Sequence, residues 1–131
     1  MTNETMTLRE MCDAFEVTPR TLRFYESKEL LFPIREGQKR LFTRRDRARL
    51  KLILQGKRFG FSLEDIRQLL DLYDTEGAEA QLRRAFDLGR KRLAELEAER
   101  AGIEAAAADL KEKLDWAVRQ LAQKPRAHAA A

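Results

Sequence analysis

The side chains best placed for chemistry in this sequence are hydrogen-bond donors gathered in one short segment. Arg20, Thr21, Arg23 and Tyr25 lie within a few positions of one another. Arginine donates paired hydrogen bonds to guanine or phosphate, and tyrosine adds a hydroxyl beside an apolar ring. We expect Tyr25 to be mainly exposed and Phe24 mainly structural, although an aromatic pair can equally serve core packing. The segment indicates recognition of an acceptor-rich partner.

Catalytic and metal chemistry lack the residues that they need. The chain has a single cysteine, Cys12, and a single histidine, His128. A zinc site requires several Cys, His or carboxylate ligands, and a nucleophilic triad requires a well-placed histidine. One cysteine also excludes a disulfide framework within the chain. The sequence therefore predicts no metal site, no cofactor and no enzyme, and Cys12 is interpreted as a buried, inert thiol, with a redox sensor as the alternative.

Basic charge is concentrated in one block. The 26 Lys and Arg residues exceed the 22 Asp and Glu residues by a formal charge of +4, but residues 35–58 alone have a net charge of +8. Such a block favours a polyanion, usually nucleic acid, and a solvated basic helix face is the alternative. The ten basic residues of this block are Arg35, Lys39, Arg40, Arg44, Arg45, Arg47, Arg49, Lys51, Lys57 and Arg58.

Length and composition indicate a folded protein without a membrane span. The 131 residues are 44% hydrophobic and 37% charged, which is too apolar and too patterned for a wholly disordered chain. No stretch approaches the roughly 18 consecutive apolar residues of a membrane span. The N-terminus is not a basic region followed by an apolar run, so no secretory signal is predicted. We therefore expect a cytoplasmic protein.

Two short helices joined by a tight turn are expected near the N-terminus. A capping-box pattern at Thr7 and Glu10 opens a helix over about residues 7–14. Thr18 caps a second helix over about residues 19–28, where Pro19 is tolerated in the first turn. Two short helices with such a turn are typical of a helix-turn-helix.

A basic β-hairpin and two further helices complete the first part of the chain. Pro33 prevents a helix and Gly37 permits a turn between short extended arms, so a wing carrying Lys39 and Arg40 is predicted. A second capping box opens a helix from 43 to about 58, and Ser62 opens a fourth. Because residues 74–77 form a polar break, we predict a winged helix-turn-helix domain over 1–75.

A long helix with a heptad pattern is expected over residues 76–122. Steps of four and three along it meet mainly apolar residues, which is typical of a coiled coil. So long a seam needs another helix, most simply from a second chain, and a helix folded back within one chain is the alternative. Residues 123–131 are expected to be a disordered tail. The predicted dimerisation residues are Leu82, Phe86, Leu93, Leu96, Ile103, Leu110, Leu114 and Leu121.

These motifs together resemble the MerR family of bacterial transcription regulators. The resemblance covers residues 7–75 and extends to the position of the long helix. It rests on the family order and spacing of Val17-Thr18-Pro19-Arg20-Thr21-Leu22-Arg23-Phe24-Tyr25-Glu26, Leu30-Leu31, Arg40-Leu41-Phe42 and Gly60-Phe61-Ser62-Leu63-Glu64-Asp65-Ile66.

The resemblance implies a mostly α-helical protein with a winged helix-turn-helix domain and a homodimer joined by an antiparallel coiled coil. It implies binding to an inverted-repeat promoter whose overlong spacer is bent and untwisted for RNA polymerase, a form of indirect readout. The DNA-binding residues that it implies are Thr18, Arg20, Thr21, Arg23 and Tyr25 on the second helix, Lys39 and Arg40 on the wing, and Lys57 and Arg58 at the end of the third helix.

The departures from the family concern the inducer. Metal-sensing members have cysteines at the two ends of the dimerisation helix, which this chain lacks, and drug-sensing members have a large C-terminal ligand domain. The chain is therefore interpreted as a short form without a recognisable sensor. The run 45–63, with Leu72-Tyr73-Asp74 after it, most resembles the proteobacterial MerR subgroup that controls branched-chain amino-acid and fatty-acid catabolism. A coiled-coil interaction protein whose basic domain docks a protein or RNA is the alternative function.

Overall fold

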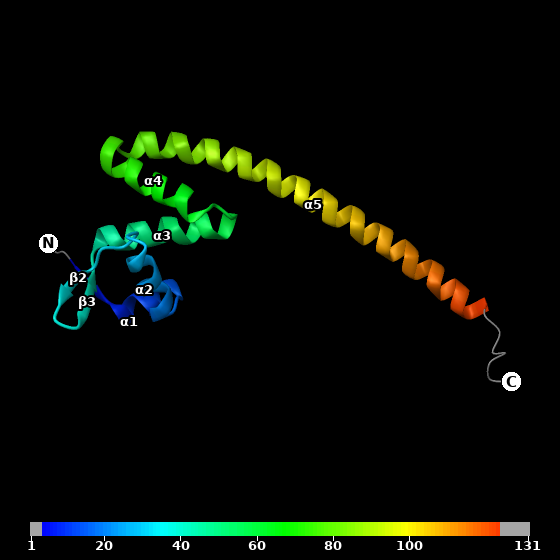
Figure 1. Cartoon of the computed structure of the whole chain (residues 1–131), viewed down its shortest axis with the longest axis horizontal. Helices are drawn as coiled ribbons and strands as arrows, with labels where there is room; N and C mark the ends of the chain where they lie inside the picture. Colours follow the sequence, from blue (N-terminus) through cyan, green and yellow to red (C-terminus); the bar gives the residue numbers. More distant parts are fainter. Residues whose placement is uncertain (1–3, 124–131) are drawn as a thin grey trace. The chain divides into compact units, whose positions relative to one another are not determined.

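The computed structural model describes residues 4–123, and their elements are mainly helical (Figure 1). The chain folds as two compact units, Met1–Gly89 and Arg90–Ala131. The first unit contains a helix-turn-helix, a small sheet and two further helices. In chain order the elements are β1 (Met6–Thr7), α1 (Leu8–Phe15), α2 (Pro19–Ser27), β2 (Ile34–Glu36), β3 (Lys39–Phe42), α3 (Arg44–Phe59), α4 (Leu63–Glu76) and α5 (Ala78–Gln123).

The two helices of the helix-turn-helix begin where the capping patterns in the sequence predict. The Thr7 side chain accepts a hydrogen bond from Glu10 N at 3.2 Å, and Glu10 Oε1 accepts one from Thr7 N at 2.8 Å. Thr18 caps α2 by accepting from Thr21 N at 3.2 Å. Because each cap satisfies backbone donors that the first helical turn leaves unpaired, both helices begin at the predicted positions.

The hairpin belongs to a three-stranded antiparallel sheet in the order β1-β3-β2. Arg35 pairs with Arg40 and Glu36 with Lys39, and the turn between them contains Gly37 at a φ of +62°. The strand β1 was not predicted from the sequence, because two residues are too short to show a period. It pairs Met6 with Phe42, which ties the start of the chain to the wing.

One apolar core holds the helix-turn-helix, the sheet and α3 together. Cys12 is half-buried and packs against this core, and burial raises the pKa of its thiol, with Asp13 adding to the rise. A raised pKa keeps the thiol protonated, consistent with the interpretation of an inert side chain. The buried core residues are Met11, Leu22, Tyr25, Leu30, Leu31, Phe42, Leu50, Ile53, Ile66 and Leu70.

The prediction that Tyr25 is mainly exposed and Phe24 mainly structural is wrong, because the structure shows the reverse. Tyr25 is only 1% exposed, whereas Phe24 is 42% exposed. Tyr25 lies three residues after buried Leu22 and so shares its face of the helix, while Phe24 lies two residues after it and points elsewhere. That spacing was the available signal. Burial also raises the pKa of Tyr25.

Asp46 joins α3 to the segment between α2 and the wing. Its carboxylate accepts hydrogen bonds from Thr43 N at 3.1 Å and Thr43 Oγ1 at 3.2 Å, and Thr43 caps the helix in return. The second carboxylate oxygen accepts from Phe32 N at 2.9 Å. Asp46 is buried, so these bonds satisfy a charge that would otherwise be costly. The capping box predicted at this helix is therefore present, and it has a tertiary partner.

Close packing of α3 on α4 depends on Gly56. A Cβ atom at this position would lie 2.8 Å from Cγ1 and 3.0 Å from Cδ1 of Ile66, a buried residue of α4. Gly60 then ends α3 in the left-handed region, with a φ of +89°. Glycine at both positions sets the angle and distance at which α4 returns along α3.

Replacing Gly56 with alanine is expected to destabilise the fold by about 1–3 kcal/mol, because buried Ile66 has little room to move. Chemical denaturation followed by circular dichroism measures the change. Gly102→Ala is the matched control, since nothing lies within 4 Å of a Cβ at that helical position. The control should be neutral or stabilising by up to about 1 kcal/mol. Equal effects from both variants would contradict the packing role of Gly56.

The long helix α5 carries an uncovered apolar stripe. Its last described residue is Gln123, and residues 124–131 of the predicted tail lie outside the described part. No residue of α5 is buried in the single chain. No described helix is long and apolar enough to cross a membrane. The predicted seam residues that are exposed are Leu82, Phe86, Leu93, Leu96, Ile103, Leu110, Leu114 and Leu121.

Candidate nucleic-acid interface

The helix α2 presents two arginines from a rigid base. Leu22 and Tyr25 are buried in the core and hold one face of the helix in place. Arg20 and Arg23 are exposed, and their spacing of three residues places them on one side of the helix. Arginines held in this way can donate paired hydrogen bonds to base edges or phosphates at little conformational cost.

Thr18, which caps α2, and Thr21 in its first turn also stabilise the start of the helix. Thr18 is exposed and Thr21 is half-buried. Their hydroxyl groups lie 3.0 Å apart, and Thr18 Oγ1 also accepts the hydrogen bond from Thr21 N. The helix cap therefore already holds these hydroxyl groups in place before a partner binds.

Glu26 fixes the wing against α2. Its carboxylate lies 2.6 Å from Arg40 Nε and 3.3 Å from Arg35 Nη1. Arg40 is therefore half-buried and ion-paired, whereas Lys39 at the tip is exposed. The sequence did not point to Glu26, because only the fold brings it near residues nine and fourteen positions away. Of the two predicted wing residues, Lys39 is the better placed to meet a phosphate, and Arg40 positions the wing.

Lys57 and Arg58 are exposed in the last turn of α3. Cations at this end of a helix are favourable because they face its partial negative charge. Both cations therefore stabilise the end of the helix. Because they are exposed, they can also contact the phosphate backbone of a nucleic acid. In Figure 1, α1, α2 and the hairpin lie on one side of α3 and α4 lies on the other.

The described residues contain no group of three or more potential metal ligands. The sequence has one cysteine, Cys12, and it packs against the core of the first unit.

This arrangement defines a winged helix-turn-helix protein whose helix α2 exposes arginine hydrogen-bond donors. The sequence model of the MerR HTH family regulatory proteins matches residues 6–73, and a second model, described as MerR, DNA binding, matches residues 47–113. The first match covers more than half of the 131 residues. The chain belongs to the MerR family of helix-turn-helix transcription regulators. The family resemblance and the fold class predicted from the sequence are confirmed, and the subgroup stays a prediction.

Relatives and a solved structure agree with this family. The chain is similar to the HTH-type transcriptional regulator ZntR of Escherichia coli K12, at 45% identity over 65 residues, or 48% of this chain and 46% of ZntR. It thus matches about half the length of that relative. It is 32% identical over 94 residues to HmrR of Rhizobium leguminosarum bv. viciae, covering 70% of each chain. Its fold matches HiNmlR, a MerR family regulator lacking the sensor domain and bound to promoter DNA, with a TM-score of 0.62, 24% identity and coverage of 91% and 94%.

Proposed function

We propose that this protein is a sequence-specific transcription regulator that binds promoter DNA as a homodimer. The observation that carries the proposal is the pair Arg20 and Arg23, exposed on a helix whose other face is locked into the core. In a member of a family of transcription regulators, such a helix is suited to the major groove, where arginine reads guanine.

The proposed contacts divide between base edges and the DNA backbone. Arg20 and Arg23 read bases or desolvated phosphates, supported by Thr18 and Thr21. The exposed wing tip and the end of α3 contact phosphates on the flanking backbone, through Lys39, Lys57 and Arg58. Tyr25 is omitted from the proposed contacts because its ring is buried, and Arg40 acts through its ion pair with Glu26.

The apolar stripe of α5 supports the proposed homodimer. Exposed leucines recur along it at heptad spacing, and an identical helix from a second chain would cover them. The antiparallel orientation follows from the family resemblance. We therefore propose that residues 1–75 bind DNA and residues 76–122 join the two chains. Two DNA-binding domains related by a two-fold axis suit an inverted repeat.

The proposed regulator acts by changing the shape of its promoter. Bending and untwisting an overlong spacer costs several kcal/mol and is offset by contacts that only the deformed DNA allows. RNA polymerase would then read the realigned elements in the bacterial cytoplasm. No catalytic step is part of this proposal, and a turnover screen should find none.

Fluorescence anisotropy on DNA from upstream of the protein's own gene tests the proposal, with scrambled DNA as the reference at about 0.15 M salt. A preference of about 10³ or more is expected of a sequence-specific regulator. Equal binding to both DNAs would indicate a nonspecific basic module or a target elsewhere. Absence of binding to either DNA would contradict the proposal and favour a coiled-coil protein that docks another protein or RNA.

Replacing Lys39 with alanine is expected to lower the salt dependence of DNA binding. Each neutralised phosphate contributes about 0.9 to the slope of log K against log salt, so the variant should lose about one unit. Gln38→Ala, at the neighbouring tip position, is the uncharged control. Anisotropy titrations at several salt concentrations give the slopes. An unchanged slope for Lys39→Ala would place the wing tip away from the DNA backbone.

A further inference from the structure

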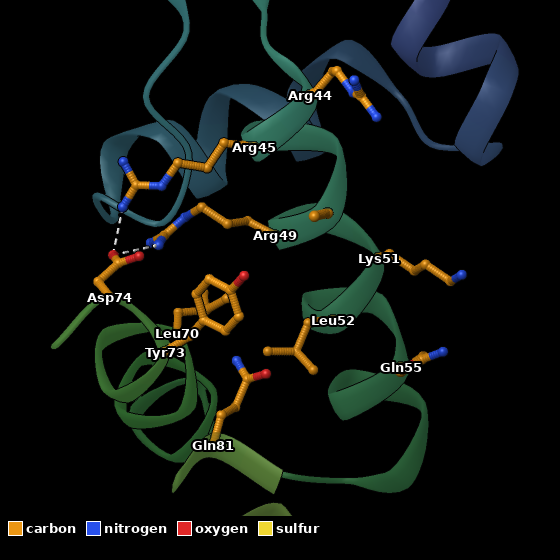
Figure 2. Close-up of a pocket in the computed structure, with 11 residues that line it drawn as sticks. Arg44, Arg45, Arg49, Lys51, Leu52, Gln55, Leu70, Tyr73, Asp74 and Gln81 are labelled. Atoms are coloured by element: carbon orange, nitrogen blue, oxygen red, sulfur yellow. Dashed lines mark hydrogen bonds and ion pairs between the residues drawn. The ribbon is translucent and has the colours of Figure 1, made fainter. Parts of the chain in front are cut away.

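A cavity of about 460 Å³ opens between α3, α4 and the first turns of α5 (Figure 2). Its volume falls within the range of about 300–1,000 Å³ that is typical of small-molecule sites. All of its lining residues belong to the unit Met1–Gly89. None of the side chains proposed above to contact DNA lines it, so the DNA-binding function leaves this cavity unexplained.

One end of the cavity holds two cations on a single carboxylate. In Figure 2, Arg45 and Arg49 converge on Asp74, with Arg49 Nη1 3.4 Å from Asp74 Oδ2 and Arg45 paired to the same oxygen. The Arg49 side chain is only 7% exposed, and its Nε donates to Leu30 O at 2.7 Å. Burial lowers the pKa of Arg49, and repulsion by Arg45 adds to the effect, while Asp74, Asp71 and Asp46 oppose it. The residues that line the cavity include four cations, Arg44, Arg45, Arg49 and Lys51, and one carboxylate, Asp74, so the lining has an excess of positive charge.

Arg45 is the cation that can accept a new partner. Its side chain is 61% exposed at the rim, so its ion pair with Asp74 is screened by water and contributes little to stability. Arg49 remains beneath it, held by Leu30 and Asp74. An incoming anion can therefore pair with Arg45 while Asp74 remains paired with Arg49.

The opposite end of the cavity is apolar. Leu52 projects from α3 toward Leu70 and the ring of Tyr73 on α4, and Gln81 of α5 lies beside them (Figure 2). Tyr73 is 53% exposed, so its ring offers uncovered apolar surface at this wall. Gln81 Nε2 donates to Leu69 O at 3.0 Å, which anchors the amide at the wall.

We propose that this cavity binds a small amphipathic carboxylate, whose anionic group pairs with Arg45 and whose apolar body lies between Leu52 and Tyr73. The combination of an apolar wall with a few convergent polar groups is characteristic of ligand sites. Arginine matches a carboxylate with two parallel hydrogen bonds, and a neutral analogue of the same shape would lack them.

The position of the site connects it with the DNA-binding elements. Arg49 bonds to Leu30 O, and its guanidinium lies 5.2 Å from the Phe32 ring, in the segment that joins α2 to the wing. A ligand that redistributes the Arg45, Arg49 and Asp74 pairs therefore changes the support of that segment. An effect of the ligand on DNA affinity rests on the proposed function, and DNA must then change the affinity for the ligand by the same factor. The ligand site itself does not depend on DNA.

The test is an NMR titration of the full chain, without DNA, using 4-phenylbutyrate as the probe and its neutral amide as the matched ligand. The readouts are the Gln81 side-chain amide and the Arg49 Nε–H, one from each end of the cavity. We expect saturable shifts of both signals with the carboxylate. Binding of the amide should be at least about tenfold weaker, as for loss of a charge-assisted hydrogen bond.

Two variants with opposite expected effects on carboxylate binding distinguish this proposal from a purely structural role for the ion pairs. Arg45→Gln should weaken carboxylate binding by about tenfold or more and leave amide binding unchanged. Asp74→Asn should tighten carboxylate binding by about threefold or more, because it removes the competing anion. Arg84→Gln, which removes one exposed positive charge outside the cavity, is the control for net charge and should behave like the wild type. Thermal melts confirm that each variant is folded.

The proposal would be overturned by no shift of the cavity signals, by equal binding of carboxylate and amide, or by weaker carboxylate binding to a folded Asp74→Asn variant. Carboxylate binding that appears only when the protein is dissociated into monomers would also overturn it, since a second copy would then occupy the cavity. Because the titration contains no DNA, failure of DNA binding and failure of this site give separate results.

Discussion

Replacing Leu110 with glutamate is expected to separate the proposed dimer into monomers. Leu110 is 60% exposed in the single chain and lies on the predicted seam of α5. In a coiled coil that position is covered by the partner helix, so the variant would bury an unpaired carboxylate. An uncompensated buried charge costs about 3–5 kcal/mol, which corresponds to a loss of more than about 100-fold in dimer affinity.

Sedimentation equilibrium over a range of protein concentrations measures this effect. Ala108→Glu is the matched control, because a position two residues away lies on nearly the opposite face of the helix. Circular dichroism should show that the unit Met1–Gly89 keeps its helices in both variants. An intact dimer in Leu110→Glu would mean that another face of α5 forms the interface. Dissociation of both variants would mean that helix stability, rather than the seam, holds the chains together.

Replacing Arg23 with alanine is expected to weaken binding to the cognate promoter by about 1–3 kcal/mol, or roughly 5- to 150-fold. The side chain is exposed on α2, and its removal leaves the buried face of the helix unchanged. The loss should therefore appear in DNA affinity and not in the thermal stability of the protein. Arg119→Ala, the matched control, makes the same change of charge nine positions beyond Leu110, on the opposite face of α5.

The salt dependence of the Arg23→Ala variant distinguishes the two contacts that this arginine can make. Loss of a base contact reduces discrimination between the promoter and scrambled DNA and leaves the salt slope unchanged. Loss of a phosphate contact weakens binding to both DNAs and lowers the slope by about one unit. Unchanged affinity for the promoter, with Arg119→Ala also unchanged, would contradict the assignment of α2 as the recognition helix.

The elements of the fold were predictable because their boundaries depend on nearby residues. Thr7, Thr18 and Thr43 each cap a helix within the next few positions, and Gly37 and Gly60 provide the left-handed conformations at a turn and a helix end. These interactions span a few residues and leave a signature in the sequence itself. The apolar repeat of α5 is a local signal of the same kind, repeated over the whole helix.

Prediction was less successful where two distant segments had to meet. The sequence did not indicate the strand β1, whose partner β3 lies more than thirty positions away. It placed Tyr25 on the surface, although the packing around Leu22 buries it. Lys39 and Arg40 were predicted to have equal roles, and Glu26 separates them by engaging only Arg40 of the two.

Local patterns along the chain predict the order of the helices and the wing, the concentration of cations between residues 35 and 58, and the apolar seam of α5. Short-range caps, turns and periodicity carry that information. The packing of the elements establishes which aromatic ring of α2 is buried and which wing cation is exposed, and it brings Arg45 and Arg49 to Asp74 at the edge of a cavity. These features depend on which side chains the packing of separate elements brings into contact, and no local pattern encodes that packing.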